Sequence, residues 1–170
     1  IMIEGQVHTI HTQALNPQPI PLGQILQNES EVEEKFYLNE EQIEKFAYLR
    51  GPKKIERISK DGHSYVFSEG GMSPTDLLEL PGRTMLTSEG TTNRSTHIVE
   101  VNGRKRFLTP IECERLNGFP DNWTATMSDR MRYFCMGNAL VTHLIEKMGH
   151  TIKQIESRET HNGAQISMRL

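Results

Sequence analysis

The chain has few cysteines, no long hydrophobic run and no marks of a secretory signal. Its 170 residues include two cysteines, Cys113 and Cys135, which make no disulfide framework and fit a reducing compartment. Because no run of about 18 apolar residues occurs, we expect no membrane span and no membrane partner. Residues 1–6 lack the basic and apolar regions of a secretory signal. We therefore expect a cytoplasmic protein.

Aromatic residues and positive charge are also scarce. Hydrophobic residues make up 35% of the chain and aromatic residues 6%, which is compatible with one core. A chain of this length is expected to form one domain, or one small domain with an appended segment. The net charge of −3 argues against a generally basic, phosphate-binding surface. Basic residues nevertheless cluster at 50–60 and 104–106, either as a binding face or as solvated charges.

Capping residues predict where helices begin and end. Asn39 and Gln42 form a capping box for a helix that stops at Gly51. A second helix is predicted over 138–148 and would end at Gly149. The apolar residues expected on the buried face of the first helix are Ile43, Phe46 and Ala47.

Turn signals predict short strands between these helices. Lys60-Asp61-Gly62-His63 favours a hairpin turn, and Asn102-Gly103 favours a type I′ turn. Alternating prolines between 17 and 21 block both helix and central strand. The strands are expected within 54–69 and at 84–87, 97–101 and 106–108.

A predicted strand runs directly into a short helix within residues 106–121. Thr109 caps this helix, Pro110 occupies its first position and Glu112 its third, which completes a capping box. Gly118 ends the helix after about two turns. The local pattern predicts a well-defined joint and contains no catalytic group.

The same stretch, 106–121, resembles the ninth motif of DNA (cytosine-5)-methyltransferases nearly letter for letter. At the expected distance, Met136-Gly137-Asn138-Ala139-Leu140 resembles the tenth motif. The resemblance covers roughly residues 17–150 and is strongest after residue 83. It implies an α+β fold, in which a small β-rich target recognition domain is followed by helices that complete a Rossmann-like domain binding S-adenosylmethionine.

The resemblance implies four segments along the chain. Residues 1–35 would be an extended connector, and 36–108 would be the recognition domain. Residues 109–149 would hold the two motif helices, a hinge and the return to the cofactor domain. Residues 150–170 would be a tail, either disordered or an extra helix.

The chemical motifs of the family are not in this sequence. It has no Phe-x-Gly-x-Gly turn for the cofactor, no Pro-Cys dipeptide and no Glu-Asn-Val. Methylation at cytosine C5 needs a thiolate that adds at C6, an acid at N3 and a flipped base. We therefore expect no catalytic residue here, no activity alone, and a partner chain or domain that carries these motifs. The chain would be a split subunit or a C-terminal fragment.

The resemblance places the flipped cytosine near Thr84-Met85. The polar loop that follows has side chains suited to base edges: Arg94 for guanine, Glu89 for a cytosine amino group and Asn93 for adenine. Double-stranded DNA is thus the expected partner. The candidate DNA-binding residues are Arg83, Thr84, Met85, Thr87, Ser88, Glu89, Asn93 and Arg94, with Lys53 and Lys54 suited to phosphates.

The two motifs imply further roles. Arg115 is expected to pair with Glu112 across one helical turn or to reach back to the recognition domain. The residues that match cofactor-lining positions are Asn138, Ala139 and Leu140. Those that match the structural positions of the ninth motif are Arg106, Thr109, Glu112 and Arg115.

Two other interpretations stay open. An unpaired apolar face on the helix 138–148 would suit a non-catalytic DNA-binding or dimerising module, and even a homodimer. A zinc or thiol enzyme would rest only on His8, His11 and the two cysteines, which are too few ligands for a typical zinc site.

Overall fold

The computed structural model describes residues 2–9, 11 and 18–161. Helices and antiparallel hairpins both occur, as the expected α+β class requires. The elements are β1 (Met2–Ile3), β2 (Gln6–Val7), three 3-10 turns (Leu22–Gln24, Glu29–Glu31, Glu34–Phe36), α1 (Glu40–Arg50), β3 (Lys53–Ile58), β4 (Ser64–Glu69), β5 (Ile98–Val101), β6 (Arg104–Phe107), α2 (Pro110–Leu116), α3 (Asp129–Asn138) and α4 (Thr142–His161).

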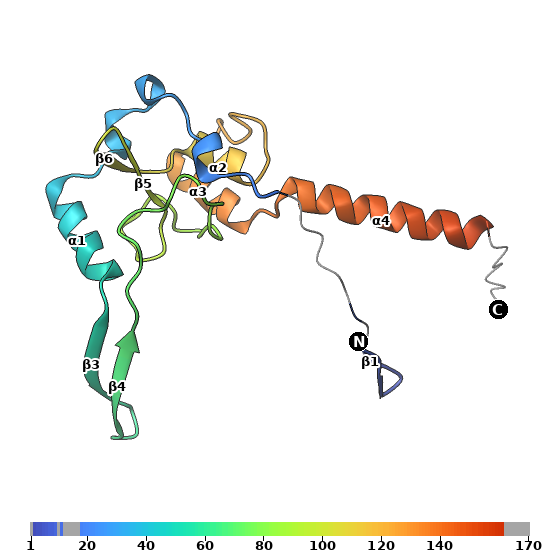
Figure 1. Ribbon diagram of the computed structural model, residues 1–170, viewed down its shortest axis with the longest axis horizontal. Helices are drawn as coiled ribbons and strands as arrows, with labels where there is room; N and C mark the ends of the chain where they lie inside the picture. Colours follow the sequence, from blue (N-terminus) through green and yellow to red (C-terminus); the bar gives the residue numbers. More distant parts are fainter. Residues whose placement is uncertain (1, 10, 12–17, 162–170) are drawn as a thin grey trace.

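Two elements extend from a central body (Figure 1). The body contains α2, α3 and the β5–β6 hairpin, with α1 at its edge. The β3–β4 hairpin projects beyond α1, and α4 projects from the opposite side. In the described part of the chain every sheet is a two-stranded antiparallel pair of consecutive strands. Long-range order therefore comes from side chains that join these small units and from isolated backbone contacts, such as the Pro21–Pro81 and Tyr37–Arg106 bridges.

The main core forms where residues 22–36 meet the β5–β6 hairpin and the helices that follow. Leu22 and Val99 are almost fully buried there, at 1% and 0% exposure. The expectation of an extended connector over 1–35 therefore needs amending, because residues 22–36 form 3-10 turns and supply core side chains. The buried residues of this core are Leu22, Ile25, Phe36, Met85, Val99, Leu108, Cys113, Tyr133 and Met136.

The capping box predicted for α1 is present. The Gln42 N–H donates to Asn39 Oδ1 at 2.8 Å, and the Asn39 N–H donates to Gln42 Oε1 at 3.0 Å. The expected buried face was only partly right, since Ala47 is exposed while Phe46 and Arg50 are buried. Arg50 is buried because the Ser73, Pro74 and Thr96 carbonyls and the Asp76 carboxylate, all in the segment between β4 and β5, accept hydrogen bonds from its guanidinium.

Both predicted hairpins are confirmed. β3 and β4 pair over six residues, from Lys53 opposite Glu69 to Ile58 opposite Ser64. β5 and β6 are joined by residues 102–103, whose φ angles of 52° and 76° are those that a type I′ turn requires.

The strand expected at 84–87 is absent, because this segment finds no strand to pair with. The Leu86 N–H within it, and the Arg83 N–H just before it, are satisfied by buried side chains instead. The Arg83 N–H donates to His97 Nε2 at 3.0 Å, and the Leu86 N–H donates to Glu89 Oε2 at 3.2 Å. β-prone residues alone therefore do not make a strand here.

The helix expected over 138–148 is divided differently. Asn138 closes α3, Ala139 is extended, and α4 begins at Thr142 and continues through Gly149 to His161. Gly149 costs about 1 kcal/mol relative to alanine, which does not stop a helix of this length. The tail from 150 is thus helical to 161, and residues 162–170 lie outside the described residues. No helix within the described ranges is long and apolar enough to span a membrane.

The end of α2 fixes where α4 starts. The Thr142 N–H donates to the Asn117 carbonyl at 2.9 Å, and Thr142 Oγ1 donates to the Gly118 carbonyl at 2.9 Å. The side-chain amide of Asn117 also donates to the Met136 carbonyl at 3.1 Å, at the end of α3. Three helices are therefore tied together through one asparagine.

Two glycines on successive helices provide a matched test of packing. A Cβ atom at Gly137 would lie 2.4 Å from the backbone of Leu86 and Thr87, whereas one at Gly149 would meet nothing within 4 Å. Gly137→Ala should lower the free energy of unfolding by about 2 kcal/mol through overpacking. Gly149→Ala should leave it unchanged or raise it by about 0.5–1 kcal/mol. Urea unfolding of both variants, followed by circular dichroism, measures these changes, and equal midpoints would contradict the packing argument.

Candidate functional site

A buried ion cluster joins the end of β6 to the start of α2. Arg106 is fully buried and donates to both oxygens of Glu112, at 2.8 and 2.9 Å. It also donates to Glu29 Oε1 at 3.1 and 2.9 Å. Burial alone would lower the pKa of Arg106, but the two carboxylates raise it above its ordinary value. We call these three residues the Arg106 cluster.

The same glutamate closes the predicted capping box. The Thr109 N–H donates to Glu112 Oε2 at 2.8 Å, and the Glu112 N–H donates to Thr109 Oγ1 at 3.2 Å. The Gln27 N–H donates to Glu112 Oε1 at 2.9 Å. The buried Glu112 carboxylate therefore accepts hydrogen bonds from the helix cap at Thr109, from Arg106 and from Gln27 early in the chain.

Arg115 lies outside this cluster. Its guanidinium donates to both oxygens of Asp121 at 2.7 Å and to the carbonyls of Ile25 and Leu26 at 3.1 and 3.0 Å. The expected pair with Glu112 is not formed, because Glu112 is already occupied. The hydrogen bonds from Arg115 lower the pKa of Asp121. Arg115 thus fastens residues 25–26 to α2.

Glu89 was expected to read a cytosine amino group, and the structure places it inside the protein. Its exposed fraction is 2%, and its oxygens accept from the N–H groups of His97 and Leu86. His97 Nδ1 lies 3.3 Å from Glu89 Oε1, while His97 Nε2 accepts from the Arg83 N–H. Glu89 therefore organises the loop from within and offers no oxygen to a base.

Arg83 and Met85 are also engaged within the protein, Met85 in the core and Arg83 through ion pairs, although the Arg83 side chain is 34% exposed. Arg83 donates to Asp76 at 2.6 and 3.2 Å, and Asp76 accepts from Arg50 at 3.1 Å and from the Ile98 N–H at 2.9 Å. Met85 lies in the core at 8% exposure. Nothing in the sequence marked Asp76 as the acceptor for two arginines, since a buried acceptor has no local signature.

Arg94 and Lys53 hold the base of the β3–β4 hairpin. Arg94 donates to the carbonyls of Leu49, at 3.1 Å, and Gly70, and it pairs with Glu69 at 3.2 Å. Lys53 donates to the same Leu49 carbonyl at 2.7 Å and pairs with Glu69 at 3.2 Å. Both cations are therefore already engaged, in place of the guanine and phosphate contacts expected for them.

Five of the expected DNA-binding residues remain at the surface: Thr84, Thr87, Ser88, Asn93 and Lys54. Thr87 and Ser88 line one wall of an open groove of about 1110 Å³. The other wall includes Met131 and Phe134 of α3, which are 45% and 49% exposed. Polar loop side chains thus share a common depression with both apolar and charged side chains of α3.

The tenth-motif residues lie against this loop. Gly137 packs directly on the backbone of Leu86 and Thr87. Asn138 and Leu140 are exposed just beyond that contact, while Ala139 is partly buried against the core. The fold therefore brings the residues expected to face a cofactor next to those expected to face DNA, which the sequence did not predict.

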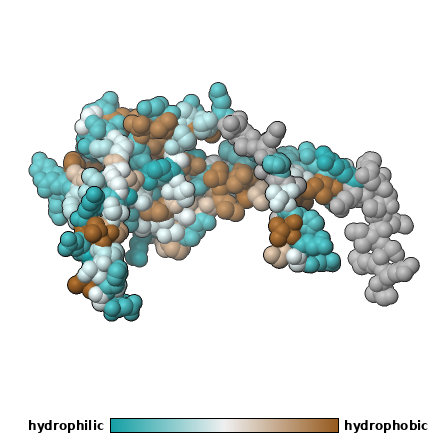
Figure 2. Space-filling model, turned by 60° about the horizontal axis from the view of Figure 1, so that its bottom comes forward, coloured by the Kyte–Doolittle hydropathy of each residue, from teal (hydrophilic) through white to brown (hydrophobic). Residues whose placement is uncertain are grey.

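α4 and the two residues before it carry an exposed apolar stripe, as expected for residues 140–148, and the stripe continues to residue 155. Figure 2 shows apolar side chains at the surface along this part of the molecule. The exposed residues are Leu140, Val141, Leu144, Ile145, Met148, Ile152 and Ile155, each between 42% and 65% exposed. A stripe of this length normally marks an interface.

The residues behind the zinc or thiol alternative are not assembled. Within the described ranges, no three His, Cys, Asp or Glu side chains are placed to share a metal ion. His8 and His11 are exposed. Cys113 is fully buried, and burial raises its pKa well above the ordinary value. Neither the two histidines nor the Cys113 thiol therefore forms a reactive site here.

The sequence is similar to those of known DNA methylases. A model of the family described as C-5 cytosine-specific DNA methylase matches residues 6–154. The type II methyltransferase M.Sau3AI of Staphylococcus aureus is 57% identical over 168 residues, 99% of this chain and 40% of that protein. The type II methyltransferase M.BanI of Aneurinibacillus aneurinilyticus is 38% identical over 50 residues, 29% of this chain and 12% of that protein.

A solved structure of the Entamoeba histolytica methyltransferase EhMeth superposes with a TM-score of 0.49 at 16% identity, covering 85% of this chain and 43% of that one. The chain spans about two fifths of the length of M.Sau3AI. The resemblance inferred from the ninth and tenth motifs is confirmed by the family match and by this curated relative.

The acid stability of the chain should depend on Asp76. Burial alone would raise the pKa of Asp76, but the Arg83 and backbone hydrogen bonds lower it below its ordinary value. Its ionised form therefore stabilises the fold above pH ~4, and this contribution is lost as the pH falls through the lowered pKa. Asp76→Asn should destabilise the chain by about 3 kcal/mol at pH 7, with a smaller difference near pH 3. Urea unfolding at both pH values measures this, and a constant difference would contradict it.

The two thiols should differ sharply in reactivity. A thiol-reactive disulfide reagent at pH 8 should modify Cys135 in the folded chain, because Cys113 is buried and its pKa is raised. Cys113 should react only after unfolding in denaturant. Cys135→Ser should therefore show almost no reaction when folded, and rapid reaction of that variant would contradict the structure.

Proposed function

The chain belongs to the C-5 cytosine-specific DNA methylase family, and from this premise we propose that it is the DNA-recognition and C-terminal portion of a site-specific DNA cytosine-5 methyltransferase of the restriction-modification type. The whole enzyme would transfer a methyl group from S-adenosylmethionine to a flipped cytosine in double-stranded DNA. The proposal covers both forms of such a portion, a split subunit and a fragment of a longer chain.

One observation carries this proposal most strongly: the contact of Gly137 with Leu86 and Thr87. It sets the exposed end of α3 beside the exposed polar side chains of Thr87 and Ser88. A recognition surface and a cofactor-side surface would have to adjoin in this way for a flipped base to reach a methyl donor. The contact thus supports one composite site that is completed by another domain.

The residues at the end of α3 fit the edge of a cofactor pocket. Asn138 offers an exposed amide and Leu140 an exposed apolar side chain, 65% accessible. S-adenosylmethionine would supply the methyl group when bound against them and the missing domain. These residues would bind and orient the cofactor, and no proton transfer or nucleophilic step is assigned to them.

Neither cysteine of this chain is assigned to the attack on cytosine C6. Cys113 lies on the buried face of α2 with a raised pKa, so it holds little thiolate at neutral pH. Cys135 lies on α3 beside Met127, and phenylalanine rather than proline precedes it. We infer that the nucleophile and the acid for N3 come from residues outside this chain, and that the chain alone transfers no methyl group.

The apolar stripe on α4 favours a second candidate function. If a second copy covers the stripe, the chain would be a DNA-binding dimer without catalysis. A sedimentation experiment at micromolar concentration distinguishes the two. A stable dimer that persists in the presence of a cofactor-domain chain would favour this alternative.

Complementation tests the main proposal. This chain is mixed with the segment of M.Sau3AI that precedes the region of similarity, with labelled S-adenosylmethionine and duplex DNA cut from plasmid. Label should enter the DNA only in the mixture. Leu144 and Met148 belong to the apolar stripe of α4 and are 55% and 53% exposed. The double variant Leu144→Glu/Met148→Glu should reduce transfer at least tenfold, because it places charges on the stripe that would contact the other chain.

The control is Lys153→Ala, an exposed change on the same helix that leaves the apolar stripe intact. It should transfer label as the parent does, and melting by circular dichroism verifies that all variants are folded. Absence of transfer from the parent mixture would refute the proposal.

A further inference from the structure

The β3–β4 hairpin, which we call the arm (residues 53–69), stands clear of the body in Figure 1. Its two strands pair over six residues, a ribbon about 20 Å long. An isolated two-stranded hairpin is at best marginally stable in water. Such a projection keeps its shape and direction only if its base is held.

The base of the arm is held by charged side chains. Lys53 and Glu69 face each other in the first register pair and form a salt bridge at 3.2 Å. Arg94, from the loop before β5, bridges the carbonyls at the end of α1 and the start of the loop after β4. These contacts fix the direction of the arm at its base. None of them involves its outer half, residues 56–66.

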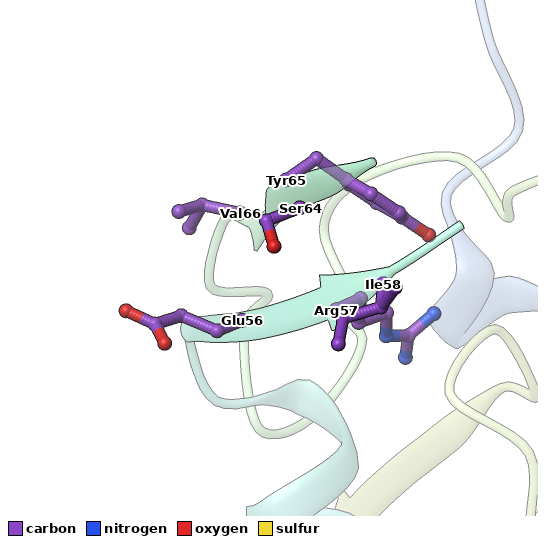
Figure 3. A pocket seen from close by; sticks show the side chains of 6 residues that line it. All are labelled: Glu56, Arg57, Ile58, Ser64, Tyr65 and Val66. Carbon is purple, nitrogen blue, oxygen red and sulfur yellow. The ribbon is translucent and has the colours of Figure 1, made fainter. Parts of the chain in front are cut away.

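The outer half has one face that is exposed throughout. In the register, Glu56 lies opposite Val66 and Ile58 opposite Ser64. Figure 3 shows the Glu56 and Val66 side chains pointing to one side of the ribbon, and Arg57 and Tyr65 to the other. Ile58 is 74% exposed and Val66 58%. Two aliphatic side chains thus point into solvent beside a carboxylate and a hydroxyl.

The charged side chains beyond the base of the arm are all exposed. Lys54, Arg57 and Lys60 form no salt bridge with any described residue, although Arg57 lies 4.2 Å from the Phe67 ring centroid. Glu56 accepts no hydrogen bond from the described chain. Between residues 54 and 68 the arm holds three basic side chains (Lys54, Arg57 and Lys60) and two acidic ones (Glu56 and Asp61), in a chain of net charge −3. Free basic groups among exposed apolar ones suit a polyanion with apolar base edges.

We propose that the arm lies in the major groove of DNA, with Glu56, Ile58 and Val66 toward the base edges and Arg57 and Lys60 toward phosphates. This rests on the proposed function. A two-stranded ribbon fits the major groove, where a carboxylate accepts from a cytosine amino group and an aliphatic side chain contacts a thymine methyl group. Glu56 supplies the exposed carboxylate that the buried Glu89 does not.

A second copy of the chain fits this face less well. Interface cores between proteins are depleted of charged residues, whereas Lys54 and Glu56 alternate with the apolar residues here. The two aliphatic side chains also lie diagonally across the ribbon and form no continuous stripe. Polar and apolar side chains are therefore interleaved on this face, which suits contacts with the base edges of DNA.

Selection from a pool of random 20-base-pair duplexes at 50 mM salt tests the arm. The selected pool then serves to measure affinity and its salt dependence. Glu56→Gln should relax selection at one base pair by about tenfold. Ile58→Ala/Val66→Ala should relax a neighbouring position. Arg57→Ala/Lys60→Ala should weaken binding to every sequence and reduce the slope of log K against log salt by about 2.

The matched control is Lys147→Ala/Lys153→Ala, which removes two exposed positive charges from α4 and should leave affinity, slope and selection unchanged. All the substituted residues of the arm are at the surface, and melting by circular dichroism verifies that the variants fold. Sedimentation of the parent and of Ile58→Ala/Val66→Ala at equal concentration measures self-association.

Three results would overturn the proposal. If the arm variants bind as the parent does while Thr87→Ala/Ser88→Ala binds weakly, the arm is outside the DNA interface and the proposed function stands. If the parent selects and binds no duplex, the proposed function fails together with the arm. If Ile58→Ala/Val66→Ala abolishes a dimer and leaves DNA binding unchanged, the exposed face belongs to a second copy.

Discussion

The rest of the chain depends on the buried pairing of Arg106 with Glu112. Both side chains are fully buried, and each satisfies the other's charge in a position where neither could stay alone. Glu29, 77 residues earlier in the chain, completes the set of acceptors. Because β6 ends and α2 begins at this pair, it fixes the angle between the loops before it and the helices after it. The loop at Thr87 and Ser88 and the apolar stripe on α4 are thus held on one frame without a shared sheet.

Features set by a few neighbouring residues could be predicted from the sequence, because caps and tight turns are local. The capping boxes at Asn39 and Thr109 and the turn at Asn102 are of this kind. The family could be identified for the same reason, because each of its two motifs is a continuous run of residues in the sequence. The buried Arg50 could not be predicted because its acceptors are far away in the sequence, and the missing strand at 84–87 could not because no described strand pairs with it.

The candidate site was harder to predict for a related physical reason. A side chain that can read a base edge can equally satisfy buried N–H and carbonyl groups, and composition does not distinguish the two uses. Glu89, Arg83 and Arg94 have the right chemistry, and the fold uses it internally. What remains outside, at Thr87, Ser88 and on the arm, is the part with few long-range bonds. Exposure separated the residues that organise the loop from those free to touch a ligand.

The burial of residues 22–36 has a consequence for building chimaeras with altered sequence preference. A transplant cut at residue 36 would leave Arg106 without Glu29 and would open a hole where Leu22 and Ile25 lay. A cut after residue 108 would separate Thr109 and Glu112 of α2 from Arg106 of β6. Glu112 completes the cap of α2 and also pairs with Arg106. The smallest segment that contains both the Arg106 cluster and the core residues packed around it runs from residue 22 to the end of α3, about two thirds of the chain. Exchange of specificity between relatives would therefore succeed at those joints, well outside the β-rich segment itself.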